Sequence, residues 1–227
     1  LFGEFGVPVF EDAAEGLGGS FGEHKLGSLG SGGVLSFNGN KILTTSGGGM
    51  LVTNDEAFAT KVRFWATQSR EDLPWYEHEE IGYNYRLSNI LAALGRSQLE
   101  RIDQTVARRR EVRELYRAGL TGLESVSVQP DPTWGRSNAW LSVVSFGLGV
   151  YSEAPTRVRL ALEEHNIESR PIWKPMHQQP VFASARSFMS GKADSVYASG
   201  LCLPSGPGIT DSDIEEICSV ISSTLDS

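Results

Sequence analysis

Lys41 is the residue in this sequence that is best suited to chemistry. It lies in a run of small and polar residues, 36–50, with short apolar segments at 34–35 and 50–52. Apolar segments bounded by Gly and Asn predict two short strands joined by a tight loop, which would hold the lysine over a rigid base. A lysine amine is a nucleophile only after it loses its proton, through desolvation or a neighbouring cation.

The loop around Lys41 could also bind a phosphate, because it is rich in glycine and hydroxyl residues. Its backbone N–H and side-chain O–H groups suit an anion. Pyridoxal phosphate (PLP) requires a lysine beside a phosphate-binding loop. The lysine forms a Schiff base with one end of the cofactor, and the loop binds the phosphate at the other end. The alternative is a surface hairpin with a solvated lysine, since most lysines are exposed.

Asp12, Glu15 and Ser36 are of the types that would complete such a site. Residues 7–15 predict an apolar strand that ends in acidic residues. Asp12 and Glu15 stand at its carboxyl end, where ligands of open α/β sheets bind. A carboxylate there can pair with the protonated pyridine nitrogen, Glu15 can reach O3′, and Ser36 can donate to the phosphate. The alternative for Asp12 is a helix N-cap or a turn acid.

Composition indicates an ordinary globular protein without a basic surface. The 227 residues carry a net charge of −8, which disfavours nucleic acid and anionic membranes as partners. Cys202 and Cys218 match no metal-ligand spacing and are expected to be buried thiols in a reducing compartment. No apolar run is long enough for a membrane helix and no signal peptide is recognisable, so we expect a cytoplasmic protein.

Helical and loop patterns follow the lysine segment. We expect a helix from Asn54 or Asp55 to about residue 68, and a second helical stretch over 87–120 that is broken near Asp103. Between them, residues 69–86 form a long loop rich in Trp, Tyr, His and Arg, which indicates binding of a ligand or of another subunit. His78 in this loop is expected to be a hydrogen-bonding residue rather than a metal ligand.

The last third predicts a smaller α/β unit. Strands are expected at 124–128, 139–146, 167–170 and 201–204, and helices at 155–165, 192–199 and 211–225. A proline-rich loop at 170–180 contains His177.

Three segments together resemble the PLP-dependent nucleotide-sugar aminotransferases of the DegT/DnrJ/StrS family. They are Glu-Asp-Ala-Ala-Glu-Gly at 11–16, Ser-Phe-Asn-Gly-Asn-Lys-Ile-Leu-Thr-Thr-Ser-Gly-Gly-Gly at 36–49, and Gly-Tyr-Asn-Tyr-Arg-Leu-Ser-Asn at 82–89. The resemblance covers essentially the whole chain. It is strongest to the members that aminate UDP-linked 4-keto-6-deoxy-N-acetylhexosamines, the bacillosamine and perosamine group.

The resemblance implies a role for each matching residue. Lys41 matches the Schiff-base lysine and proton shuttle, Asp12 the pyridinium partner, and Ser36 a phosphate-binding serine, while Glu15 falls near O3′. Asn84 matches an asparagine that reaches the cofactor phosphate of a neighbouring subunit, which implies an obligate homodimer. His177 matches a histidine of the sugar-nucleotide pocket, with a turn hydrogen-bonder as the alternative, and Tyr83 and Arg86 are expected to bind substrate.

The resemblance also implies the fold, the type I α/β fold of PLP-dependent transferases such as aspartate aminotransferase. Residues 1–118 would be the C-terminal part of the large domain with a bridging helix, and 119–227 the small domain. Because the chain opens at Leu1 without a methionine and family members are longer there, we expect a piece of a longer protein that is inactive by itself.

The implied reaction is amination of a nucleotide-linked 4-keto-6-deoxy sugar with glutamate as the expected donor. Two alternatives remain open. A sugar dehydratase of the same family is disfavoured by Lys41, since those enzymes carry His at that position. A non-catalytic aminotransferase-like regulator or scaffold would bind PLP or a partner without turnover.

Overall fold

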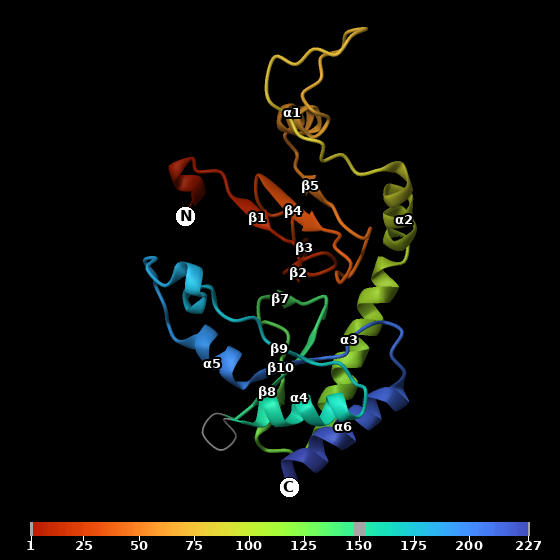
Figure 1. Ribbon diagram of the computed structural model, residues 1–227, viewed down its shortest axis with the longest axis vertical. Helices are drawn as coiled ribbons and strands as arrows, with labels where there is room; N and C mark the ends of the chain where they lie inside the picture. The colour runs from red at the N-terminus through yellow and green to blue at the C-terminus, as the bar shows by residue number, and fades with distance from the viewer. Residues whose placement is uncertain (1, 148–152, 227) are drawn as a thin grey trace. The chain divides into compact units, whose positions relative to one another are not determined.

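The computed structural model describes residues 2–147 and 153–226 and divides into two compact units. Unit 1 contains residues 1–106 and 131–138, and unit 2 contains residues 107–130 and 139–227. Helix α3 (Ile102–Gly119) contributes residues to both units (Figure 1). The domain boundary expected at residue 118 stays a prediction.

Unit 1 is built on a small mixed sheet with the strand order β1-β4-β5. Strand β1 (Phe10–Asp12) runs parallel to β4 (Gly32–Ser36), and β4 is antiparallel to β5 (Gly49–Val52). The two strands predicted around Lys41 therefore form as a hairpin, but its loop spans residues 37–48 and is not tight. Figure 1 shows β1 and β4 side by side.

A second small sheet of unit 1 joins distant parts of the sequence. Strand β2 (Ser20–Phe21) pairs with both β3 (His24–Lys25) and β7 (Gly135–Arg136). Two short strands, β2 and β3, therefore lie in the glycine-rich stretch 16–33. A short 3₁₀ helix, η1 (Phe2–Phe5), precedes β1.

The helices of unit 1 begin after capping residues, of which Asp55 was predicted. Helix α1 (Glu56–Ala66) is capped by Asp55, whose carboxylate accepts a hydrogen bond from the Phe58 N–H. Helix α2 (Asn89–Leu99) is capped in the same way by Ser88. The helical stretch predicted over 87–120 breaks at residues 100–101, between α2 and α3, close to the expected position.

Unit 2 packs helices against a four-stranded antiparallel sheet with the order β6-β8-β10-β9. Its strands are β6 (Val126–Val128), β8 (Ser142–Phe146), β9 (Arg170–Pro171) and β10 (Gly200–Leu203). Its helices after α3 are α4 (Ala154–Glu164), α5 (Lys192–Ser199) and α6 (Asp211–Asp226), with short 3₁₀ turns η2 (Met176–Gln178) and η3 (Pro180–Phe182). The three helices form as predicted to within one or two residues. Strands β6 and β8 are shorter than predicted, β10 is shifted by one residue, and β9 shares only Arg170 with the strand predicted at 167–170.

The core of unit 2 comes from the alternation of β8 and from the inner faces of three helices. Val144 and Phe146 on β8 are buried against Tyr116, Leu162 and Ile217 from α3, α4 and α6. Burial of this apolar surface is the main stabilising contribution to the unit. Both cysteines are buried free thiols, as predicted. Among the described residues, no helix combines the length and the apolar character needed to cross a membrane.

Glu11 anchors the glycine-rich loop of unit 1 to strand β1. Its carboxylate accepts hydrogen bonds from the backbone N–H groups of Gly27, Leu29 and Gly30. Burial acts to raise the pKa of Glu11, but these three hydrogen bonds outweigh it, and the pKa is lowered below its ordinary value.

We expect Glu11→Gln to lower the free energy of unfolding of unit 1 by about 1–3 kcal/mol, because charged acceptors make the stronger hydrogen bonds. A lowered folded-state pKa stabilises the protein above the unfolded-state pKa, about 4.3 for Glu, and this stabilisation is lost as the pH falls through the folded value. Urea unfolding at pH 7 and at pH 3.5 should therefore show a larger difference between wild type and variant at pH 7. Glu23→Gln, at an exposed carboxylate of the same unit, is the control. Equal losses in the two variants would contradict the anchor.

Gly119, the last residue of α3, allows α6 to pack closely. A Cβ atom at this position would lie 2.7 Å from Cys218 Sγ. We expect Gly119→Ala to destabilise unit 2 by about 1–2 kcal/mol through overpacking. In a Cys218→Ala background the loss should be smaller, because Sγ is gone and only the Cβ atom of residue 218, at 3.2 Å, remains close. Thermal unfolding of the wild type, the two single variants and the double variant gives the coupling energy between the two positions. Additive losses of stability would exclude the proposed clash.

Candidate active site

The loop that carries Lys41 is ordered by its own backbone. The Phe37 N–H donates to Gly48 O at 3.0 Å, and the Thr45 N–H donates to Phe37 O at 2.9 Å. The side chains of Phe37, Leu43 and Thr45 are buried. Buried side chains and internal hydrogen bonds make this loop a fixed platform for the lysine.

Helix α2 holds the same loop through a single glutamine. Gln98 Nε2 donates to Thr44 O at 2.6 Å, and the Thr44 N–H donates to Gln98 Oε1 at 3.1 Å. Gly95, one turn earlier, brings the helix close to the loop, since a Cβ atom there would lie 2.8 Å from Thr45 Cγ2. The amide of Gln98 thus satisfies both backbone groups of Thr44 and fixes the loop against the helix.

The amine of Lys41 forms an ion pair with Glu15. Lys41 Nζ donates to Glu15 Oε1, although the two residues are 26 positions apart. The lysine side chain is 11% exposed, whereas that of Glu15 is 51% exposed. Asn138 fixes the backbone beside the carboxylate by donating to the carbonyl oxygens of Glu15 and Leu17. The structure therefore brings together the largely buried amine of Lys41 and the half-exposed carboxylate of Glu15.

Asp12 and Ser36 end the two parallel strands next to this pair. Asp12 is the last residue of β1 and lies opposite Val34, two residues before Ser36 at the end of β4. Parallel strands have their carboxyl ends at one edge, so both polar side chains belong to the edge from which the Glu15 segment departs. Asp12 Oδ1 accepts a hydrogen bond from the Ala14 N–H at 3.2 Å. This contact is the one expected if Asp12 serves to stabilise a turn, which was the alternative to a role in cofactor binding.

These residues fit the donor set that PLP needs. The chain offers a largely buried primary amine, carboxylates at a strand edge and a hydroxyl at the end of the neighbouring strand. An amine can bond the aldehyde carbon, a carboxylate can hold a pyridinium N–H, and a hydroxyl can donate to a phosphate. The chemistry of the site and of the cofactor are therefore compatible.

Tyr83, Asn84 and Arg86 lie on the exposed segment that follows the long polar loop. This segment is attached to the end of α1, because the Tyr83 N–H donates to Trp65 O and Asn84 forms an isolated bridge with Thr67. All three side chains are exposed. The aromatic rings of Tyr83 and Tyr85 stack at 5.1 Å.

His177 belongs to unit 2, in the 3₁₀ turn η2. Its Nε2 atom lies 2.7 Å from Asp194 Oδ1 on α5. His78, in contrast, bonds the Gln68 carbonyl with Nδ1, as the hydrogen-bonding interpretation of that loop predicted.

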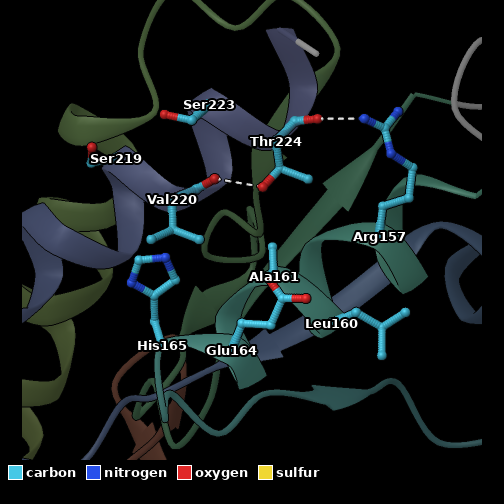
Figure 2. Close-up of a pocket in the computed structure, with 9 residues that line it drawn as sticks. All are labelled: Arg157, Leu160, Ala161, Glu164, His165, Ser219, Val220, Ser223 and Thr224. Atoms are coloured by element: carbon cyan, nitrogen blue, oxygen red, sulfur yellow. Dashed lines mark hydrogen bonds between the residues drawn. The ribbon is translucent and has the colours of Figure 1, made fainter.

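A surface pocket of about 560 Å³ lies between α4 and α6 of unit 2. Figure 2 shows Arg157 bonded to the Thr224 carbonyl on one side of it and His165 on the other. It contains none of the site residues predicted from the sequence.

Several residues that position the site were not predicted. Gln98 and Asn138 act across 54 and 121 or more residues, and nothing local in the sequence pairs them with Thr44 or Glu15. Asp194 was predicted only as a residue of a helix. The signal that could have singled it out is its place in the first turn, where an acidic side chain is favourable.

The fold is that of the type I PLP-dependent transferases. The chain belongs to the DegT/DnrJ/EryC1/StrS aminotransferase family, whose model matches residues 1–222. The fold class and family predicted from the sequence are therefore confirmed, and PLP is the cofactor of this family.

Named relatives agree with this assignment. The chain is 45% identical over 221 residues to EpsN of Bacillus subtilis (strain 168), named as a pyridoxal phosphate-dependent aminotransferase, and covers 56% of it with 96% of its own length. It is 37% identical to the GDP-perosamine synthase of Caulobacter vibrioides, with 96% of the chain covering 58% of that protein. The aminotransferase TlmJ from Streptoalloteichus hindustanus matches in structure with a TM-score of 0.89 at 26% identity, over 99% of this chain and 60% of TlmJ. The chain thus spans less than two thirds of these relatives.

Removing the glutamine amide should loosen the lysine loop. We expect Gln98→Ala to remove two hydrogen bonds of about 1 kcal/mol each and to speed hydrogen exchange at the Thr45 amide by roughly tenfold or more. Gln104→Ala, at an exposed position at the start of α3, is the control. Unchanged exchange at Thr45 in the Gln98 variant would show that the loop does not need α2.

Proposed function

We propose that the intact protein is a PLP-dependent aminotransferase that acts on a nucleotide-linked 4-keto-6-deoxy sugar. The observation that carries the proposal is the ordered loop that brings the Lys41 amine against Glu15, next to the strand edge of Asp12 and Ser36. Family membership and the name of the GDP-perosamine synthase support the sugar-nucleotide class. The chain shares the family's scaffold over residues 1–222.

Four residues would bind the cofactor and transfer or hold protons during the reaction. When bound, PLP supplies an aldehyde carbon that condenses with amines and a ring that withdraws electrons from the adjacent carbon. Lys41 takes a proton at Nζ from the reacting carbon and returns it, and Glu15 holds the ammonium form beside it. Asp12 would hold a proton on the ring nitrogen, and Ser36 would donate a hydrogen bond to the phosphate.

The net reaction conserves atoms and electrons. The amino acid donor, proposed to be glutamate, loses its amino group and becomes a 2-oxo acid. The keto carbon of the sugar accepts that amino group in place of its oxygen. One molecule of water released in one half-reaction is consumed in the other, so no external oxidant is needed.

A second copy of the protein is part of the proposal. Trp75, Tyr76, Ile81 and Tyr85 are 57–84% exposed on the segment that precedes and contains Asn84. Exposed aromatic and aliphatic side chains of this kind favour burial against another protein surface. We propose that Asn84 reaches the cofactor phosphate of a homodimer partner, that Tyr83, Arg86 and His177 contact the substrate, and that the enzyme works in the cytoplasm.

Borohydride reduction of the PLP-loaded intact protein tests the assignment of Lys41. We expect one reduced pyridoxyl label, on the peptide that contains Lys41, and loss of at least 1,000-fold in transamination on Lys41→Ala, since removing a central covalent or proton-transfer residue has effects of this size. Lys61→Ala is the matched control, because Lys61 also pairs with a carboxylate, that of Glu80, but is 43% exposed.

A label on another lysine would overturn the assignment of Lys41. Mass spectrometry of the sugar product would separate amination from dehydration, because the first exchanges oxygen for nitrogen and the second removes water. A product without added nitrogen would overturn the proposed reaction.

A further inference from the structure

Asp194 holds two side chains of the proline-rich loop with one carboxylate oxygen. Its Oδ1 atom lies 2.7 Å from His177 Nε2 and also accepts a hydrogen bond from Gln178 Nε2. His177 and Gln178 are consecutive residues of the turn η2, while Asp194 is the third residue of helix α5. One acid therefore fixes the orientation of both neighbours across 17 residues of chain.

The acid is suited to this role by its place in the helix and by its charge. An anionic side chain is favourable in the first turn, where backbone N–H groups are unpaired. The hydrogen bond from His177, followed by that from Gln178, lowers the pKa of Asp194. The side chain is thus held as a carboxylate acceptor.

This contact fixes which nitrogen of His177 remains available. A carboxylate accepts only, so Nε2 must carry the hydrogen in both the neutral and the charged imidazole. Within residues 2–147 and 153–226, Nδ1 of His177 has no hydrogen-bond partner. Nδ1 is therefore the ring atom that can meet a ligand.

The surroundings of His177 have the character of a binding surface. Trp173, Met176 and Val181 are 62%, 63% and 78% exposed within a few residues of it, whereas the histidine side chain is only 21% exposed. Apolar side chains exposed around an oriented polar group are typical of ligand sites.

We propose that Asp194 is a positioning residue that locks His177 in the Nε2–H form, so that Nδ1 contacts the nucleoside diphosphate part of the substrate. This inference rests on the proposed function, in which His177 binds the sugar nucleotide. Asp194 itself does not touch the ligand. It acts only through the imidazole that it holds.

Binding of UDP and of GDP to the intact, PLP-loaded protein tests the inference by calorimetry, with the tighter-binding nucleotide used for all variants. We expect His177→Ala and Asp194→Ala each to weaken binding about tenfold, which corresponds to about 1.4 kcal/mol. Asp194→Ala in the His177→Ala background should have no further effect, because its role is lost with the histidine. Glu216→Ala is the matched control, since this carboxylate lies 3.9 Å from His165 in the same unit.

The outcomes distinguish the proposed role of His177 in substrate binding from the proposed role of Asp194 in positioning His177. If His177→Ala leaves binding unchanged, the pocket assignment in the proposed function is wrong. If His177→Ala weakens binding but Asp194→Ala does not, or if the two losses add, the positioning role is wrong.

Nitrogen NMR of the intact protein labelled in its histidines gives a readout that does not depend on activity, with the His177 signals identified by their loss in His177→Ala. We expect the Nε2–H form of His177 in the wild type and in Asp194→Glu, and mixed tautomers in Asp194→Ala. A single unchanged tautomer in the alanine variant would overturn the inference. If that variant does not fold, Asp194→Asn replaces it, with mixed tautomers expected because an amide can donate as well as accept.

Discussion

The parallel pairing of β1 with β4 is the constraint on which the site depends. Its register sets Asp12 opposite Val34 and so brings Asp12 and Ser36 to the same edge of the sheet. The antiparallel return through β5 then closes a loop from which Lys41 reaches Glu15, just beyond the end of β1. A shift of one residue in this register would turn the polar side chains to the opposite face of the sheet.

The lysine loop is an irregular segment that buried side chains and hydrogen bonds hold in place. Leu43 and Thr45 are buried on either side of Thr44, and Gln98 satisfies the backbone of Thr44 itself. A nucleophile on a mobile loop would lose orientation each time the chain moved, and small misplacements are costly in catalysis. The buried polar contacts around Lys41 hold the loop in place, as the proposed role of its amine requires.

Local patterns in the sequence predicted the elements that carry the site, but not the contacts that orient it. Asp55 caps helix α1 where expected, and the hairpin around Lys41 forms, because caps and apolar runs act over a few residues. The short strands β2 and β7 were missed, since their pairing joins residues more than 110 positions apart. The contact of Lys41 with Glu15 depends on the same kind of long-range closure, so spacing alone could suggest the residues but not their distance. The family resemblance supplied what local physics could not, namely the roles expected for Asn84 and His177.

The most direct test of the central claim is a crystal structure of the intact protein with PLP. The account predicts electron density that is continuous from Lys41 Nζ to the cofactor, with the Asp12 carboxylate about 3 Å from the ring nitrogen. A cofactor bound with Lys41 still paired to Glu15, or with Asp12 on the far side of the sheet from the ring, would contradict it.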